Sequence, residues 1–363
     1  MFGACANTRG IQSRDMALTS KSKPTFPKLT LKSSVEFDSG RREIYVLCIT
    51  GTNKDLDGTI AASGSNNCIN VYTNRGSGLE VAYQIEASGR GEGVVSGLEW
   101  ADRQLCASST DGHVRLWDTR KSSKTPTSTF QGYNHEPFNC VSSDMSGSLI
   151  AAGSDLVGED AAIYIWDLRM GRDPIGQFTE SHSDDIVAVQ FKPDSTYSLA
   201  SGSTDGLVCL FDLHTMEEEE AVISVKNSEA SVCKVGFCGL NHLYCLTHEG
   251  GCVVWENAEV CGVEPLYTDR NVKNTIQDEF GVDIDYLVDY HYQSSSDELF
   301  LVGGDNSGGV RVLHCEDMKS PKPVGLFIGG HTATVRALYW DSTVDGETLV
   351  TGGEDGLVCL WTL

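Results

Sequence analysis

The chain has 363 residues and a formal net charge of −24, and 40% of its residues are hydrophobic. This length can bury a large core, and the acidic balance argues against nucleic-acid binding, which needs a positive face. The sequence contains no run of 18 apolar residues, so it predicts no membrane-spanning helix.

Thirteen cysteines occur without any Cys-x-x-Cys pair, and several fall inside expected strands. This placement indicates buried free thiols in a reducing compartment rather than disulfides. We therefore expect an intracellular protein, nuclear or cytoplasmic.

Residues 1–28 are predicted to form a disordered basic tail, rich in Ser, Thr and Lys and containing Pro24 and Pro27. Residues 1–32 hold six Lys or Arg and one Asp, a net charge of +5, which leaves −29 for residues 33–363. An Arg-containing leader with few acids is also compatible with an organelle-targeting segment. That alternative stays open.

The next segment alternates in the manner of a β-strand. Apolar residues at Leu29, Leu31, Val35 and Phe37 share one parity, which places them on one face of an extended chain.

One hairpin phrase then recurs along the chain. Its clearest copies are built around Asp111-Gly112, Asp205-Gly206 and Asp355-Gly356, each between two apolar runs. Such a turn needs positive φ, which Gly supplies, so the pattern predicts two antiparallel strands joined by a tight turn. The second strand ends on a large apolar residue.

Weaker copies of the phrase complete a set of seven units. Their closing residues are Tyr72, Trp117, Trp166, Phe211, Trp255, Leu313 and Trp361. The successive separations are 45, 49, 45, 44, 58 and 48 residues, by subtraction of those positions. A supersecondary unit repeated at this period is typical of a radial repeat protein.

The repeats resemble the WD40 family, through Gly330-His331, Trp117-Asp118 and Trp166-Asp167. This resemblance implies an all-β fold, a monomeric seven-bladed β-propeller of four-stranded blades spanning residues 29–363. The last unit reaches Trp361 with no residues left for an outer strand. We expect the N-terminal strand at residues 29–37 to fill that place and close the ring, because an open sheet edge would otherwise remain.

The resemblance also implies a hydrogen-bonded set of His, Ser or Thr, Asp and Trp within a blade. The matching residues are His331, Thr351, Asp355 and Trp361 in the last unit, and His182, Ser201 and Asp205 in the fourth. In the fourth unit Phe211 replaces Trp, and in the second Ala107 replaces the hydroxyl residue. His, Asp and Ser together could suggest hydrolysis, but the repeat explains them as structural groups that satisfy one another.

A metal-like set, His242, Cys245, His248 and Cys252, is a weaker signal. Strand alternation turns positions 242 and 248 to one side and 245 to the other, whereas a structural zinc site needs four convergent ligands. The sequence therefore predicts no catalytic residue, metal or cofactor, and we expect a non-enzymatic protein.

Two consecutive units carry Trp-Asp-x-Arg. The residues are Asp118 with Arg120, and Asp167 with Arg169. In the WD40 family this pair resembles the motif of substrate receptors of cullin-4 RING ubiquitin ligases, in which the Arg contacts the ligase adaptor from the bottom face. The alternative is that both Arg residues only pair with nearby carboxylates.

Acidic residues gather in the loops that the repeat places at one end of the ring, which we call the top face. The candidates for partner binding are Glu159, Asp160, Asp184, Asp185, Asp278, Glu279 and Asp283. Glu217–Glu220 are expected on the opposite, bottom face. Charge runs are often merely solvated, but insertions on one face often mark binding.

These features predict an interaction scaffold whose acidic top face binds a basic protein or peptide, with no direct contact to nucleic acid or membrane. The alternative function is that of a cullin-4 ligase receptor using Arg120 and Arg169.

Overall fold

The computed structural model of the 363-residue chain describes residues 28–38, 44–52, 58–74, 78–87, 93–121, 124–239, 241–256, 259–294, 296–343 and 346–362, without the side chains of 28, 29 and 342–348. The predicted basic tail lies outside the described residues, apart from Lys28. No described helix is long and apolar enough to cross a membrane.

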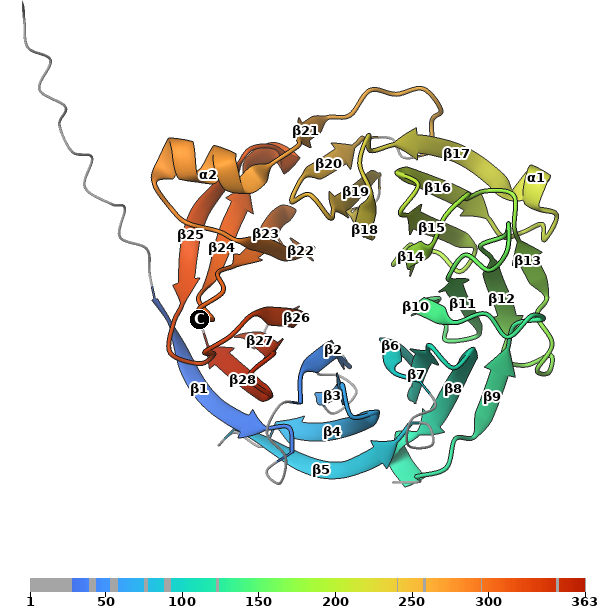
Figure 1. The fold of residues 1–363 in the computed structure, drawn as a ribbon, viewed down its shortest axis with the longest axis horizontal. Helices are drawn as coiled ribbons and strands as arrows, with labels where there is room; N and C mark the ends of the chain where they lie inside the picture. Colours follow the sequence, from blue (N-terminus) through green and yellow to red (C-terminus); the bar gives the residue numbers. More distant parts are fainter. Residues whose placement is uncertain are drawn as a thin grey trace, which may run out of the picture.

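Seven antiparallel blades form a ring around a central channel (Figure 1). Blade 1 contains β2 (Val46–Gly51), β3 (Thr59–Gly64), β4 (Cys68–Asn74) and β5 (Leu79–Glu86); blade 2 contains β6 (Val95–Ala101), β7 (Gln104–Ser109), β8 (His113–Asp118) and β9 (Ser128–Gln131); blade 3 contains β10 (Phe138–Ser143), β11 (Leu149–Ser154), β12 (Ile163–Asp167) and β13 (Gly176–Phe178). Blade 4 contains β14 (Ile186–Phe191), β15 (Ser198–Ser203), β16 (Leu207–Asp212) and β17 (Val222–Asn227); blade 5 contains β18 (Val232–Cys238), β19 (His242–Thr247), β20 (Cys252–Trp255) and β21 (Tyr267–Asp269). Blade 6 contains β22 (Tyr286–Gln293), β23 (Glu298–Gly304), β24 (Val310–Cys315) and β25 (Pro321–Phe327); blade 7 contains β26 (Val335–Thr343), β27 (Gly346–Gly353) and β28 (Leu357–Thr362).

The N-terminal strand β1 (Lys28–Glu36) completes blade 7, as predicted. It runs antiparallel to β28, from the pair Thr30–Thr362 to the pair Glu36–Leu357. It also pairs in parallel with β25 at Lys28–Leu326, a contact that the sequence did not reveal. Blades 6 and 7 therefore form one eight-stranded sheet, and β1 both closes the ring and joins two blades.

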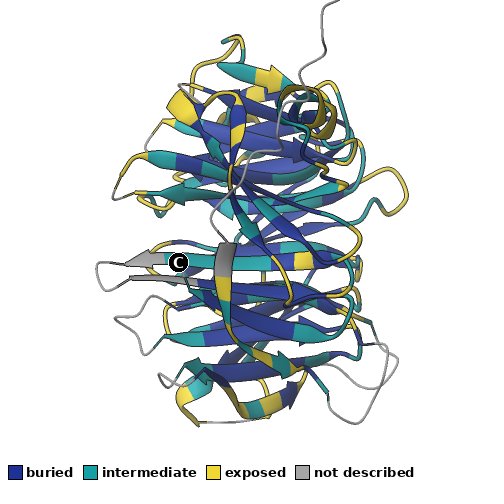
Figure 2. Cartoon of the chain, turned by 90° about the vertical axis from the view of Figure 1, so that its left-hand side faces the viewer, coloured by how far each residue is buried: buried dark blue, intermediate teal, exposed yellow. Residues whose placement is uncertain are grey.

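The predicted closing residues all lie on the third strand of a blade and are almost inaccessible to solvent. Their exposed fractions are 1% or less: Tyr72, Trp117, Trp166, Phe211, Trp255, Leu313 and Trp361. Burial of a large apolar side chain contributes about 1.5–3 kcal/mol. Figure 2 shows buried residues running along the strands and exposed residues gathering at loops and edges. Packing between neighbouring blades therefore dominates the core.

The Asp-Gly turns have the backbone that the sequence predicted. Gly112, Gly206 and Gly356 have φ of 79°, 86° and 73°. Each donates its N–H to the carbonyl three residues earlier, at 3.1–3.2 Å. The positive φ would strain any residue with a Cβ.

Each blade runs outward from the channel, and this fixes the two faces. Turns between second and third strands, and connections from one blade to the next, lie on the top face. Turns between first and second strands, and between third and fourth strands, lie on the bottom face.

Two helices at the outer rim interrupt this plan (Figure 1). Helix α1 (Glu218–Ala221) precedes β17, and the Glu218 carboxylate accepts the backbone N–H groups of Thr179 (2.7 Å) and Glu180 (3.0 Å), which follow the short strand β13. The acidic run at Glu217–Glu220 therefore lies in the connection between the third and fourth strands of blade 4, where Glu218 reaches the outer rim beside blade 3.

Helix α2 (Val272–Phe280) lies in the enlarged connection between blades 5 and 6. The Asn271 side chain caps its N-terminus by accepting the N–H of Asn274 (3.2 Å), and Gly281 ends it with φ 66°. Its buried residues Val272 and Ile276 pack into the core between the two blades. The insertion is therefore a helix packed beside β25 rather than a long loop over the channel.

Candidate interaction surfaces

The top end of blade 7 contains a complete chain of hydrogen bonds. Trp361 donates its Nε1–H to Thr351 Oγ1 (2.8 Å), which also lies 2.7 Å from His331 Nε2. His331 Nδ1 lies 3.0 Å from Asp355 Oδ1. Burial alone would raise the pKa of Asp355, but the hydrogen bonds from His331 and the Thr332 N–H outweigh it and hold that pKa below its usual range. The predicted four residues thus bind one another.

Blade 4 has the same arrangement, but without the indole N–H that Trp361 supplies in blade 7. His182 Nε2 lies 2.6 Å from Ser201 Oγ, and His182 Nδ1 lies 3.2 Å from Asp205 Oδ2. Phe211 offers no N–H at the closing position. Both His331 and His182 have side chains with no exposed surface. Neither could reach a substrate in solution.

Blade 2 uses a different polar pair at its top end. Ala107 stands where blade 7 has Thr351, because Leu105 pairs with Trp117 as Leu349 pairs with Trp361. Asp111 forms a two-pronged ion pair with Arg115, with contacts of 3.1 and 2.7 Å. The buried indole N–H of Trp117 has no partner among the described residues.

Blade 3 contains a polar group that sequence reasoning missed. Tyr164 donates to the buried carboxylate of Glu136 (2.7 Å), which also accepts the backbone N–H of Asn134 (3.2 Å). Burial and the Glu136 carboxylate together raise the pKa of Tyr164 well above its usual range. Glu136 lies in the loop before blade 3, and the equivalent loops before blades 4 and 7 contain the His of the repeat. A Glu in that loop was the only feature of the sequence that could have indicated this polar group.

The two Trp-Asp-x-Arg motifs have the same geometry on the bottom face. Arg120 binds Asp118 through Nε and Nη2, each at 2.8 Å. Arg169 binds Asp167 through the same atoms at 2.8 and 2.6 Å. The Arg side chains are 62% and 69% exposed, whereas both carboxylates are 6% exposed. Buried carboxylates therefore fix two outward guanidinium groups on adjacent blades.

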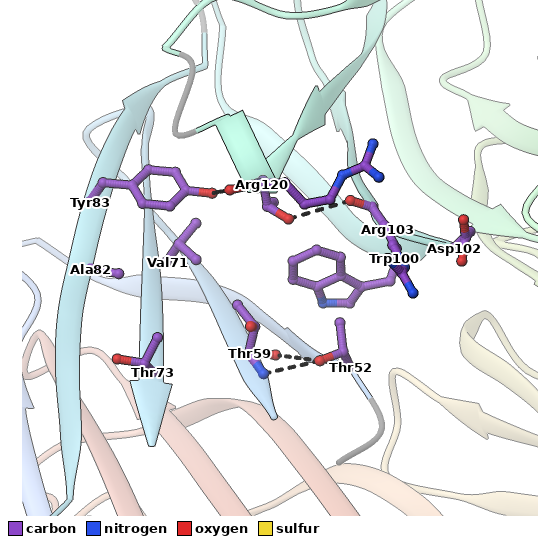
Figure 3. A pocket seen from close by; sticks show the side chains of 11 residues that line it. Thr52, Thr59, Val71, Thr73, Ala82, Tyr83, Trp100, Asp102, Arg103 and Arg120 are labelled. Atoms are coloured by element: carbon purple, nitrogen blue, oxygen red, sulfur yellow. Dashed lines mark hydrogen bonds between the residues drawn. The ribbon is translucent and has the colours of Figure 1, made fainter. Parts of the chain in front are cut away.

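A pocket of about 290 Å³ lies beside Arg120, between blades 1 and 2 (Figure 3). The Trp100 indole forms part of its wall, and Tyr83 donates across the blade boundary to the carbonyl of Thr119 (3.1 Å). Thr119 in turn donates to the carbonyl of Arg103 (3.3 Å). These bonds hold the segment that carries Arg120 against blade 1.

Four of the predicted acids meet at one corner of the top face. Glu159 and Asp160 are exposed in the turn between β11 and β12. Asp184 and Asp185 lie in the neighbouring connection from blade 3 to blade 4, where the Asp185 carboxylate accepts the N–H of Leu156 (2.7 Å). This bond ties the two loops together, so we call these four residues the acidic corner.

The other three predicted acids lie elsewhere. Asp278 and Glu279 are exposed on α2 and Asp283 follows that helix, across the ring from the acidic corner (Figure 1). The structure therefore separates the seven candidate acids into two groups.

The central channel contains charged groups that the sequence did not single out. The seven innermost strands line a cavity of about 360 Å³, with Glu99, Lys234 and Asp289 among its walls. Lys234 Nζ and Asp289 Oδ2 are 2.5 Å apart. Burial raises the pKa of Glu99 to about 7. Successive side chains on a strand point to opposite sides, so the sequence alone does not show which residues face the channel. That becomes clear only when the blades are closed into a ring.

Within the described part of the chain, no group of three or more His, Cys, Asp or Glu could hold a metal ion. His248 lies 3.0 Å from Ser231 Oγ, whereas Cys245 and Cys252 are completely buried. The cysteines that the structure describes are all free.

Comparison with known proteins gives the family of the repeats. The profile of WD40 (WD domain, G-beta repeat) matches residues 87–118, 124–167, 173–212 and 322–362, in blades 2, 3, 4 and 7. The three unmatched blades close on Tyr72-Thr73, Trp255-Glu256 and Leu313-His314, which lack both the Trp-Asp of blades 2 and 3 and the Phe-Asp of blade 4.

Relatives cover most of the chain. The WD repeat-containing protein 89 homolog of Dictyostelium discoideum is 27% identical over 88% of this chain and 82% of its own length. WD repeat-containing protein GTS1 of Arabidopsis thaliana is 29% identical over 97% of this chain and 88% of its own length. A ribosome biogenesis protein WDR12 homolog of Oryza sativa subsp. japonica is 38% identical over 33% of this chain and 27% of its own length. Four matched repeats and a ring of seven blades identify the chain as a member of the WD40-repeat family, a seven-bladed β-propeller.

Proposed function

We propose that this protein is a non-enzymatic interaction scaffold whose acidic corner binds a basic protein. The observation that carries the proposal is the exposure of Glu159 and Asp160, whose carboxylates have no ion pair or hydrogen bond with the described residues. Their turn is fixed by the bond from Leu156 to Asp185. A preordered pair of carboxylates loses little freedom when a cationic partner arrives.

The net charge supports the same partner class. A protein with formal charge −24 attracts basic proteins over a distance and repels acidic ones. The second acidic group, Asp278, Glu279 and Asp283, would extend the contact if the partner is large enough to reach blade 6.

The name of one relative fits a basic partner. The rice relative is a ribosome biogenesis protein, and proteins that bind ribosomal RNA must present positive charge to its phosphates. A ribosomal or ribosome-assembly protein is therefore the partner class that we would test first.

The geometry of the His-containing sets supports a structural role. Each His is fully buried and bonded on both ring nitrogens, at His182 and His331. A general base needs a free nitrogen within reach of a substrate.

Capture of partners by the full chain tests the scaffold proposal. We expect wild-type protein to recover basic proteins, and the double variant Glu159→Lys, Asp160→Lys to lose them. Glu219→Lys, Glu220→Lys is the matched control, because it makes the same charge change at exposed rim positions. Equal recovery by the acidic-corner variant and wild type would reject this surface.

A cullin-4 ligase receptor is the second candidate function. The two identical Asp–Arg pairs favour it, because buried carboxylates orient planar donors that a partner can contact. The Arg120→Ala, Arg169→Ala variant should lose the ligase adaptor in the same capture experiment. Lys124→Ala, Arg172→Ala removes two exposed cations from the same face and should retain it. Recovery of no adaptor by wild type would exclude this candidate.

We further propose that the protein is nuclear, cytoplasmic or both. The free cysteines support a reducing compartment. Microscopy of a fluorescent fusion tests this, and accumulation in the secretory pathway would contradict it.

A further inference from the structure

The bottom end of the channel opens into a cavity of about 630 Å³ between blades 4, 5 and 6. Its walls come from the bottom ends of β14, β18 and β22 and the turns that follow them. Its lining includes one carboxylate and four aromatic rings, from Asp194, Phe237, Tyr290, His291 and Tyr292. We call this cavity the bottom mouth.

Aromatic rings form most of one wall. Phe237 and Tyr290 line the cavity and are only 8% and 6% exposed, so the core holds their rings in place. The hydroxyl of Tyr292 donates to Asp297 (2.8 Å). A Cβ at Gly239 would come within 3.2 Å of that hydroxyl, so the ring lies close against blade 5.

The fourth ring is uncharged. His291 stacks on Trp340 with centroids 4.4 Å apart and an angle of 8°. Burial lowers the pKa of His291 to about 4, so the imidazole is neutral at physiological pH. It therefore contributes an aromatic surface without repelling a cation.

The charges around the bottom mouth are mostly negative. Asp194 lines the cavity with a side chain that is 46% exposed. Lys192 is shared between Asp194 (4.0 Å) and Glu259 (3.6 Å). Lys234, which lines the central channel instead, is bound to Asp289. Both lysines are thus compensated, and the carboxylates outnumber them.

We propose that the bottom mouth binds an arginine side chain from an extended basic segment of a protein partner. A cation gains energy over aromatic faces, and a planar guanidinium can stack on a ring while donating to a carboxylate such as Asp194. The proposal rests on the scaffold function for its partner class, a basic protein. It adds a second contact, at the opposite end of the channel from the acidic corner.

Fluorescence anisotropy with the full chain tests the site. The probe is a fluorescein-labelled Gly-Gly-Arg-Gly-Gly peptide at low ionic strength, and its control carries citrulline, which has the same shape without the charge. We expect the arginine peptide to bind about five- to thirty-fold more tightly than the citrulline peptide, the range that a cation over aromatic rings provides.

Variants of two lining residues test its location. Tyr292→Ala and Asp194→Asn should each weaken binding of the arginine peptide by about fivefold or more. Tyr292→Phe keeps the ring and should stay within about twofold of wild type. Tyr133→Ala is the matched control, because Tyr133 is a 59% exposed tyrosine on the top face.

Three results would overturn the proposal: no binding of the arginine peptide, equal binding of the citrulline peptide, or unchanged binding by both Tyr292→Ala and Asp194→Asn. The Glu159→Lys, Asp160→Lys variant separates this site from the scaffold function. If that variant loses the basic partner while bottom-mouth variants bind it normally, the scaffold function stands and the bottom-mouth site is wrong.

Discussion

Blades 7 and 2 have the same hairpin but different polar groups inside it. Both close on a tryptophan that is 1% exposed, Trp361 and Trp117. In blade 7 the indole N–H reaches Thr351, whereas in blade 2 Ala107 leaves it without a described partner. The fold of each blade therefore follows from its apolar pattern and its Asp-Gly turn, and the hydrogen-bonded set is an addition.

The same comparison separates structural from functional polar residues. In blade 7 the polar residues of the repeat bind one another and are buried. In blade 2, Arg120 lies two residues after Asp118 of the closing Trp-Asp pair, and its side chain is 62% exposed. A motif residue becomes a candidate for partner binding where its charge remains exposed after its internal bond is made.

The largest expected effect is shared by the two blades. Trp117→Ala and Trp361→Ala should each lower the free energy of unfolding by about 3–5 kcal/mol, because both leave a large cavity between blades. Chemical denaturation followed by circular dichroism measures this. If Trp117→Ala left the free energy of unfolding unchanged while Trp361→Ala lowered it, blade 2 would not be packed as blade 7 is.

A smaller effect should appear in blade 7 alone. Thr351→Val keeps the shape but removes the group that joins Trp361 and His331, at a cost of about 1–3 kcal/mol. Ser201→Ala in blade 4 should cost less, because Phe211 has no N–H to lose. Equal costs at both positions would contradict the role given to the indole.

Much of this fold could be predicted from the sequence, because a hairpin is local. The Asp-Gly turn and the closing residue are six positions apart in blades 2, 4 and 7, from Asp111 to Trp117, Asp205 to Phe211 and Asp355 to Trp361. The weaker copies of the same hairpin located the other four blades. The pairing of Lys28 with Leu326 and the position of α2 could not be predicted, because both depend on contacts made only after the ring closes.

The candidate sites were less predictable for the same reason. The acidic residues were assigned to one face, but Asp278 and Glu279 lie at the rim because Val272 and Ile276 bury the helix that carries them. The bottom mouth joins residues from three blades, and no short motif contains them.

The pH dependence of stability should differ between wild type and Asp355→Asn. The pKa of Asp355 is depressed in the folded protein, so its contribution is fully present above the unfolded value of about 3.9 and is lost as pH falls through the depressed value. The stability difference between the two proteins should be constant near neutrality and shrink at acid pH. A difference that grows as pH falls would have the wrong sign.

The smallest expected effect is a gain. Ala107→Ser introduces a hydroxyl at the blade 2 position equivalent to Thr351, where it can accept from Trp117. The indole is already buried without a partner, so the variant should be stabilised by up to about 1 kcal/mol. Measured destabilisation would show that the position has no room for the hydroxyl.

We propose that exposed carboxylates at the acidic corner recruit a basic partner. Its most direct test is the dissociation constant of the recovered basic protein for wild type and for Glu159→Lys, Asp160→Lys, measured over a series of salt concentrations. We expect at least about tenfold weaker binding by the variant at low salt, and a difference that shrinks as salt screens the charges. Equal dissociation constants at low salt would contradict it.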